Sequence, residues 1–231
     1  GGWKNSLQIR INCLVFNHIH HEFPKLKRIT SDTGTRLYQT PSGKAYPSVT
    51  TITGQLAKKA IQEWRQRIGK EKAAAITAKA SRQGTRIHYL CEDYLSNREF
   101  RKKEFDLEMW ESIKPELDRI DNIHGLESKL FSDHLEVAGT VDCVGEYDGK
   151  LSIIDFKTSS KLKTKEQIKN YFMQTAAYAV AFEETTKVPV SNLLIIMAVA
   201  HEGVVTFKEK RDTWIDEFID LRQKYKESHG C

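Results

Sequence analysis

A strand that ends in a pair of opposite charges limits what this 231-residue chain can fold into. The stretch LSIIDFKTSS, residues 151–160, is rich in large aliphatic side chains, which indicates a buried β-strand. It nevertheless places an acid, Asp155, two residues before a base, Lys157. Because side chains alternate along a strand, these two share one face, while Phe156 points into the core behind. A buried strand with charges on one face needs a physical reason.

The preceding turn predicts which residue faces Asp155. The segment EYDGKL places Asp148–Gly149 between two strand-like segments, the strongest short signal for a hairpin with a two-residue loop. In that register Tyr147 pairs with Lys150, and Asp142 lies directly opposite Asp155. Opposed residues have Cβ atoms about 4.5–5.5 Å apart, and two carboxylates at that distance repel. The sequence therefore predicts two acids and one lysine on a single face of the sheet.

A bound divalent cation would remove this repulsion. Carboxylate oxygens suit Mg²⁺ or Mn²⁺, and these ions retain waters and accept phosphate oxygens. Such an ion polarises a phosphodiester and acidifies a bound water, while Lys157 can orient that water or hold the phosphate. The alternative is a pair of strand-end acids neutralised by lysines at the rim of the sheet. We favour the metal site for the complete set, because unpaired like charges in a sheet need a reason.

The rest of the pattern predicts an α/β fold with a mixed central sheet flanked by helices. A β-hairpin centred on Ser42–Gly43 suits the turn-rich residues 38–54. Helices are expected over residues 57–97, with breaks at Gly69 and at 81–84, and over 107–123, 170–184 and 213–227. Strands are expected over residues 126–133, 136–147, 150–158, 192–200 and 204–210, with a parallel pair around the helix that follows Lys157.

We interpret residues 1–231 as one domain. It has a basic helical N-terminal subregion at about 57–123, a sheet core at about 124–210 and a C-terminal helix at about 213–227. The longest apolar run, residues 193–200, is far shorter than the ~20 residues that cross a bilayer, so no membrane segment is expected. The four cysteines contain no C-x-x-C pair, which favours free thiols over a zinc knuckle or a Cys-ligated iron–sulfur cluster.

Three motifs in chain order resemble the PD-(D/E)xK nuclease superfamily in its RecB-like branch, and within it the mitochondrial and phage exonucleases. The segment AGTVDCVGEYDGKLSIIDFKTS, residues 138–159, resembles the superfamily core, with Asp142 as the first acid and Asp155-Phe156-Lys157 as its D-x-K. The segment GTRIHYLCEDYL, residues 84–95, resembles the upstream histidine motif, and QTAAY, residues 174–178, the downstream Q-x-x-x-Y. The resemblance covers about residues 38–225 and implies a restriction-endonuclease-like fold.

The resemblance also implies roles for individual residues. Asp142 and Asp155 would bind Mg²⁺ or Mn²⁺ together with the Phe156 carbonyl, and Lys157 would be the catalytic lysine. His88 would add an imidazole ligand, although a histidine on a helix is more often solvated or bonded within the protein. Glu127 is open between a supporting role at the metal and an exposed strand acid.

Other residues are expected at the nucleic acid. Gln174 and Tyr178 lie four apart on one helix face and would approach the site, although a core tyrosine beside a capping glutamine is nearly as good an interpretation. Thr158 could donate to phosphates, and Arg86 belongs to a strongly basic stretch that predicts a phosphate-tracking groove. That stretch contains Lys58, Lys59, Arg65, Arg67, Lys70, Lys72, Lys79, Arg82 and Arg86. Trp64 could stack a base, but we favour a core position for it.

The functional prediction is a metal-dependent exonuclease that hydrolyses single-stranded DNA from free ends, in DNA replication, repair or recombination. The alternatives are an inactive nucleic-acid-binding protein and a flap endonuclease. No helicase motif is present, so the strand must be open already or opened by a partner such as a single-strand-binding protein, recombinase, helicase or polymerase. We expect a monomer in a bacterial or phage-infected cytoplasm, with the mitochondrial matrix as the alternative.

Overall fold

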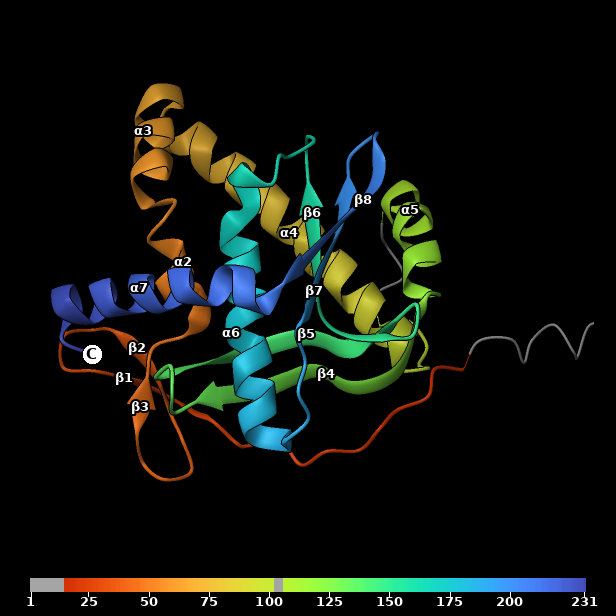
Figure 1. Cartoon of the computed structure of the whole chain (residues 1–231). Coiled ribbons are helices and arrows are strands. Elements are labelled where there is room, and N and C mark those ends of the chain that lie inside the picture. The colour runs from red at the N-terminus through yellow and green to blue at the C-terminus, as the bar shows by residue number, and fades with distance from the viewer. Residues whose placement is uncertain (1–14, 102–105) are drawn as a thin grey trace, which may run out of the picture.

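The computed structural model describes residues 15–101 and 106–231, and its centre is a mixed five-stranded sheet in the order β4-β5-β6-β7-β8 (Figure 1). Strands β6 and β7 run parallel, whereas the other neighbours are antiparallel. This arrangement confirms the predicted α/β class with its mixed sheet. The strands are β4 (Ile120–Ser132), β5 (Val137–Tyr147), β6 (Lys150–Ser159), β7 (Asn192–Val199) and β8 (Gly203–Lys210).

The β5–β6 hairpin has the predicted register. Tyr147 pairs with Lys150, and the pairing continues to Cys143 and Ile154. Both loop residues have positive φ, 50° at Asp148 and 79° at Gly149, as a two-residue type I′ loop requires. The ladder stops at the Cys143–Ile154 pair, so the two predicted acids lie just beyond the last paired residues.

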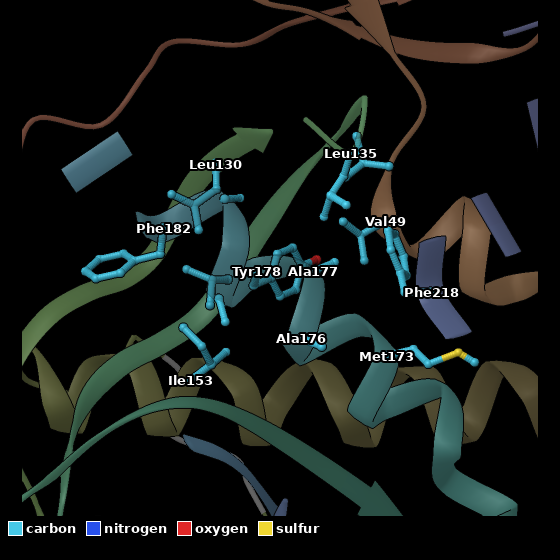
Figure 2. Close-up of a cluster of buried hydrophobic side chains, with 14 of the residues drawn as sticks. Val49, Leu130, Leu135, Ile153, Met173, Ala176, Ala177, Tyr178, Phe182 and Phe218 are labelled. Atoms are coloured by element: carbon cyan, nitrogen blue, oxygen red, sulfur yellow. The ribbon is translucent and has the colours of Figure 1, made fainter. Parts of the chain in front are cut away.

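Alternating strand side chains divide the core between the two faces of the sheet. Ile154 and Leu194 pack with helices α4 (Lys70–Leu95) and α5 (Leu107–Leu117). Ile153 and Leu193 pack with α6 (Lys169–Thr186), which follows the short 3-10 helix η1 (Glu166–Ile168). Helix α7 (Arg211–His229) lies against α6, and Figure 2 shows side chains of α2 (Val49–Gly54), α6, α7, β4 and β6 in this second cluster. In Figure 1, α4 passes behind the sheet, α5 lies beside β8, and α6 lies in front.

A small antiparallel sheet precedes the helices. Its strands are β1 (Lys27–Thr30), β2 (Arg36–Gln39) and β3 (Ala45–Tyr46), and the β2–β3 hairpin is centred at Ser42, which confirms the predicted hairpin. The turn-rich stretch then ends in helix α2 (Val49–Gly54) rather than in more turn. This helix begins because Ser48 accepts a hydrogen bond from the backbone N–H of Thr51.

Two predicted helix boundaries are wrong. The break at Gly69 exists between α3 (Lys58–Ile68) and α4, but α4 continues through residues 81–84 without interruption. Gly84 has a packing role there, since a Cβ at this position would lie 3.4 Å from Thr158 Oγ1. The helix expected to reach residue 123 ends at Leu117, because residues 120–123 belong to β4, where Ile120 pairs with Tyr147.

No helix among the described residues has both the length and the apolarity that a membrane crossing requires. Cys91, Cys143 and Cys231 are free thiols, the first two fully buried, as expected from the cysteine pattern. Cys13 lies outside the described residues.

Gly139 on β5 lets Tyr178 of α6 lie close against the sheet. A Cβ at Gly139 would be 2.8 Å from the Tyr178 hydroxyl and 2.9 Å from a ring carbon, and Figure 2 shows this ring packed among the apolar side chains. We expect Gly139→Ala to lower the free energy of unfolding by about 1–3 kcal/mol, because the ring must move within a filled core. Urea unfolding measures this, with Gly54→Ala as the control, since no atom lies within 4 Å of that Cβ. Equal stability of the two variants would contradict the prediction.

Candidate active site

Helix α4 and strands β4 and β5 bring three metal-binding side chains together. One ligand atom each from His88, Glu127 and Asp142 lies within 4.8 Å of the other two. His88 Nδ1 is 3.8 Å from Glu127 Oε1 and 3.7 Å from Asp142 Oδ1. The other ring nitrogen, Nε2–H, donates to the carbonyl oxygen of Phe156 at 2.6 Å, which fixes the tautomer and turns Nδ1 toward the acids.

Asp155 and Lys157 complete the cluster from β6. Lys157 Nζ lies 3.1 Å from Asp155 Oδ2 and 4.4 Å from the centre of the Tyr171 ring on α6. Asp155 is 4% exposed, and apart from the ion pair with Lys157 its buried Oδ2 has no hydrogen bond of regular geometry within the described residues. A buried carboxylate oxygen with an unused acceptor costs free energy unless a ligand completes it.

Asp142 is tied to the backbone of the next strand. The N–H of Phe156 donates to Asp142 Oδ2 at 2.9 Å, in the region where the β5–β6 ladder has ended. A side chain thus replaces a backbone acceptor, and the two strands separate at this point. The same peptide segment therefore contacts His88 through the Phe156 carbonyl and Asp142 through the Phe156 N–H.

The environment moves the pKa values of the two aspartates apart. Burial, and then the charge of Asp155, raises the pKa of Asp142 well above its usual value. Burial also acts against the ionised form of Asp155, but Lys157, Asp142 and His88 together outweigh it and leave the pKa of Asp155 below its usual value. Asp155 is therefore the stronger acid of the pair, and Asp142 holds a proton more readily, as expected for close carboxylates.

The bases of the cluster are held protonated by the acids. Burial alone would lower the pKa of His88, but Asp142 and Glu127 raise it to about 9. Burial also disfavours the charged form of Lys157, yet Asp155 and Asp142 raise its pKa above the usual lysine value. In the metal-free protein, the positive charges of His88 and Lys157 therefore offset the negative charge of the acids.

Glu127, which sequence reasoning left open, belongs to the cluster. Its backbone has φ of 46°, inside a strand, and it lies across from Asp142 in the β4–β5 register without forming a regular pair. A left-handed conformation costs a non-glycine residue about 1–2 kcal/mol, so it persists only where surrounding contacts enforce it. The turn Asp133–Glu136 sets this register, because Ser132 pairs with Val137 on either side of it. It has no Asn-Gly or Asp-Gly signature, so the register could not be predicted from the sequence.

The donor set fits a hard divalent cation. Carboxylate oxygens and one imidazole are present, the buried Oδ2 of Asp155 has no polar partner besides Lys157, and the acids are close enough to need a counter-charge. These features suit a hard divalent cation rather than a soft-ligand metal. The Phe156 carbonyl has a second lone pair beside the one used by His88, and so stays available as a ligand.

The predicted nucleic-acid residues are placed unequally. Thr158 lines an open pocket of about 410 Å³ together with His88, Glu127 and Lys157. Arg86 is half-buried on α4 but lines a different pocket with Lys79 and His201. The pocket at the cluster is thus walled by α4 on one side and by the end of β6 on the other.

Gln174 and Tyr178 are buried, at 8% and 4% exposure, and Gln174 Nε2 donates to the Tyr178 hydroxyl at 3.5 Å. The second interpretation, a core tyrosine, describes the position of Tyr178, and contact with nucleic acid stays a prediction for both. Tyr171, which sequence reasoning missed, lies over Lys157. Helical spacing was the available signal, because residues 171, 174 and 178 share one face of α6.

Comparison with known proteins agrees with this geometry. A family model described as the PD-(D/E)XK nuclease superfamily matches residues 34–229. Mitochondrial genome maintenance exonuclease 1 of Homo sapiens is 32% identical, over 61% of this chain and 44% of its own length. The Xenopus tropicalis protein of that name is 35% identical over 57% and 42%, and that of Mus musculus 33% identical over 57% and 43%.

The chain spans less than half the length of these curated relatives. The family match, in contrast, covers most of the chain, including the five-stranded sheet and every side chain of the acid–lysine cluster. The mixed sheet and the D-x-K segment at Asp155–Lys157 agree with that match. The chain belongs to the PD-(D/E)XK nuclease superfamily.

Proposed function

We propose that this protein is a metal-dependent nuclease that degrades single-stranded DNA from its ends, with Mg²⁺ or Mn²⁺ at the cluster of His88, Glu127, Asp142 and Asp155. The observation that carries the proposal is the close pair of acids beside a protonated lysine, with Asp155 buried and its Oδ2 bonded to Lys157 alone by an ion pair. The curated relatives are named exonucleases, which supports cleavage from ends.

The residues divide the chemistry among them. A bound divalent ion supplies Lewis acidity and lowers the pKa of a coordinated water. Asp142, Asp155, Glu127 and His88 Nδ1 would hold that ion, and the His88 Nε2–H bond to Phe156 keeps the ring oriented. Lys157 keeps its charge next to the pocket, where it stabilises negative charge that grows on a phosphate. Tyr171 limits the orientations of the lysine through its ring.

Helices α3 and α4 offer a surface for the strand. Helix α3 buries none of its residues, and Trp64 is only partly covered, so the core position we favoured for it is wrong. Exposed Ile61 and Ile76 lie on these two helices among basic side chains. Cationic and apolar groups together suit a single strand, whose phosphates and bases are both accessible. This supports Arg86 and Trp64 as nucleic-acid contacts.

The cellular setting is also a proposal. We infer a role in DNA replication, repair or recombination, as a monomer that acts with a partner able to expose single strands. The relatives carry the names of mitochondrial proteins, which favours the mitochondrial matrix over the cytoplasm. A PD-(D/E)XK domain can also cut flaps, and an inactive binder would keep the fold, so the experiment must separate these activities.

The test uses single-stranded DNA labelled separately at the 5′ and 3′ ends, a matched duplex, and a covalently closed single-stranded circle. We expect Mg²⁺- or Mn²⁺-dependent loss of linear single strands, none in EDTA, and an intact circle, because an exonuclease needs an end. Cutting of the circle would indicate an endonuclease. Binding of the linear strand without loss of either label would indicate an inactive binder.

A further inference from the structure

An N-terminal segment holds the irregular part of β4. We call residues 16–23 the strap; in Figure 1 it is the red segment that runs beneath β4. Strand β4 is at the edge of the five-stranded sheet, so its outer backbone groups have no strand partner on that side. The strap pairs with this edge in parallel at Ile123, whose N–H donates to Asn17 O and whose carbonyl accepts from Ile19 N–H, both at 2.8 Å. At Ile123, the strap thereby satisfies the backbone groups on the free edge of β4.

The strap contacts β4 where that strand departs from regular geometry. The β4–β5 register shifts between Asp121 and Gly125, and Asn122 has φ of 45°. Asn17 is bonded to this irregular turn of chain by two contacts, its N–H to Asp121 Oδ1 at 2.8 Å and its Nδ2–H to Asn122 Oδ1 at 2.7 Å. A bulge of this kind re-aims the side chains that follow it.

Two side chains of the strap contact the residues of β4 that precede Glu127. His21 Nε2 and His124 Nδ1 are hydrogen-bonded at 2.8 Å, and their rings stack. The ring of Phe23 lies against Gly125, where an added Cβ would be only 3.2 Å from Phe23 Cζ. Gly125 is two residues before Glu127, and the Ser128 hydroxyl closes the bend by accepting from Leu126 N–H at 3.0 Å.

We infer that the strap positions Glu127: by holding residues 121–125 of β4, it maintains the bend that points the Glu127 carboxylate at His88 and Asp142. The inference rests on the proposed metal-dependent function. Glu127 has a left-handed backbone that an isolated strand would not keep. The contacts on the outer side of β4 that support it come from the strap, and Phe23 lies against Gly125, two residues before Glu127.

The experiment measures Mn²⁺ binding to the full chain without DNA, by electron paramagnetic resonance of free Mn²⁺. We expect Phe23→Ala to raise the dissociation constant about tenfold, the effect typical of residues that orient a metal ligand. Phe207→Ala is the matched control, because it removes the same atoms from β8 at the opposite edge of the sheet and should leave binding unchanged. Circular dichroism confirms folding, and Phe23→Leu replaces Phe23→Ala should the latter not fold.

A double-mutant cycle tests whether the strap acts through Glu127. In a Glu127→Gln background, Phe23→Ala should cause no further loss of Mn²⁺ affinity. Wild-type affinity in folded Phe23→Ala, or an equal loss with and without Glu127, would overturn the inference and leave the proposed function intact. If neither the wild-type chain nor Glu127→Gln binds Mn²⁺, the proposed function is overturned, and the inference with it.

Discussion

Asp142→Asn is expected to abolish DNA cleavage and at the same time to stabilise the metal-free protein. Asparagine keeps an oxygen for the Phe156 N–H, but it removes a buried carboxyl whose pKa is raised by burial and by Asp155. Its amide can also donate to Asp155, which has an unused acceptor. We expect the free energy of unfolding in EDTA to rise by about 1 kcal/mol, in the range seen when an active-site conflict is relieved.

Activity should fall on the order of a thousandfold, because a ligand and its charge are lost at the point where the phosphate must be polarised. Release of label from single-stranded DNA and urea unfolding in EDTA measure the two effects on the same preparation. The control is Asp148→Asn, which changes an exposed acid in the hairpin loop that pairs with Arg119. Full cleavage activity in Asp142→Asn would contradict the proposed active site. A loss of stability in this variant would contradict the inference that Asp142 and Asp155 repel each other in the metal-free protein.

Lys157→Met should abolish cleavage but destabilise the protein, the opposite sign in stability to Asp142→Asn. Methionine fills a similar volume without charge, so Asp155 is left buried and without its ion pair at 3.1 Å. Loss of one partner of a buried pair typically costs about 3 kcal/mol. We expect the free energy of unfolding in EDTA to fall by about that amount, and cleavage to fall on the order of a thousandfold.

Added Mg²⁺ should restore part of the stability of Lys157→Met, because the cation then neutralises Asp155 in place of the lysine. Lys157→Arg is the companion variant, since it keeps the charge and should keep most of the stability, while the wider guanidinium disturbs the contact with Tyr171. Equal stability of the Met variant and the wild type in EDTA would show that Asp155 does not depend on Lys157.

The central hairpin was predictable because one local signal determines it. Asp148–Gly149 selects a two-residue loop, the loop sets the register, and the register places Asp142 and Asp155 together. Apolar periodicity likewise located all five strands of the sheet and the helix between β6 and β7. His88 followed from a resemblance, since nothing in a helical pattern alone says that a histidine 68 residues before Phe156 will contact it.

What could not be predicted depends on contacts between distant segments. Glu127 reaches the cluster through a left-handed backbone just after a register shift in β4, and neither has a signature in the residues around it. Residues 81–84 looked like a helix break, yet they continue α4, where Gly84 faces Thr158 of β6. Residues 120–123 extend β4 because Tyr147 and the strap supply partners on its two edges.

The polar contacts of Phe156 with this site come from its main chain alone. Its amide hydrogen goes to Asp142 and its carbonyl oxygen to His88, while its ring, 2% exposed, packs in the interior behind β6 and meets the His88 ring edge-on, with the ring centres 6.4 Å apart. A substitution other than proline keeps both polar contacts, so it is tolerated or rejected by the volume and shape of its side chain. The variable middle position of the D-x-K motif thus has a structural explanation. The proposed catalytic role constrains the Asp and the Lys, whereas packing in the apolar core constrains the residue between them.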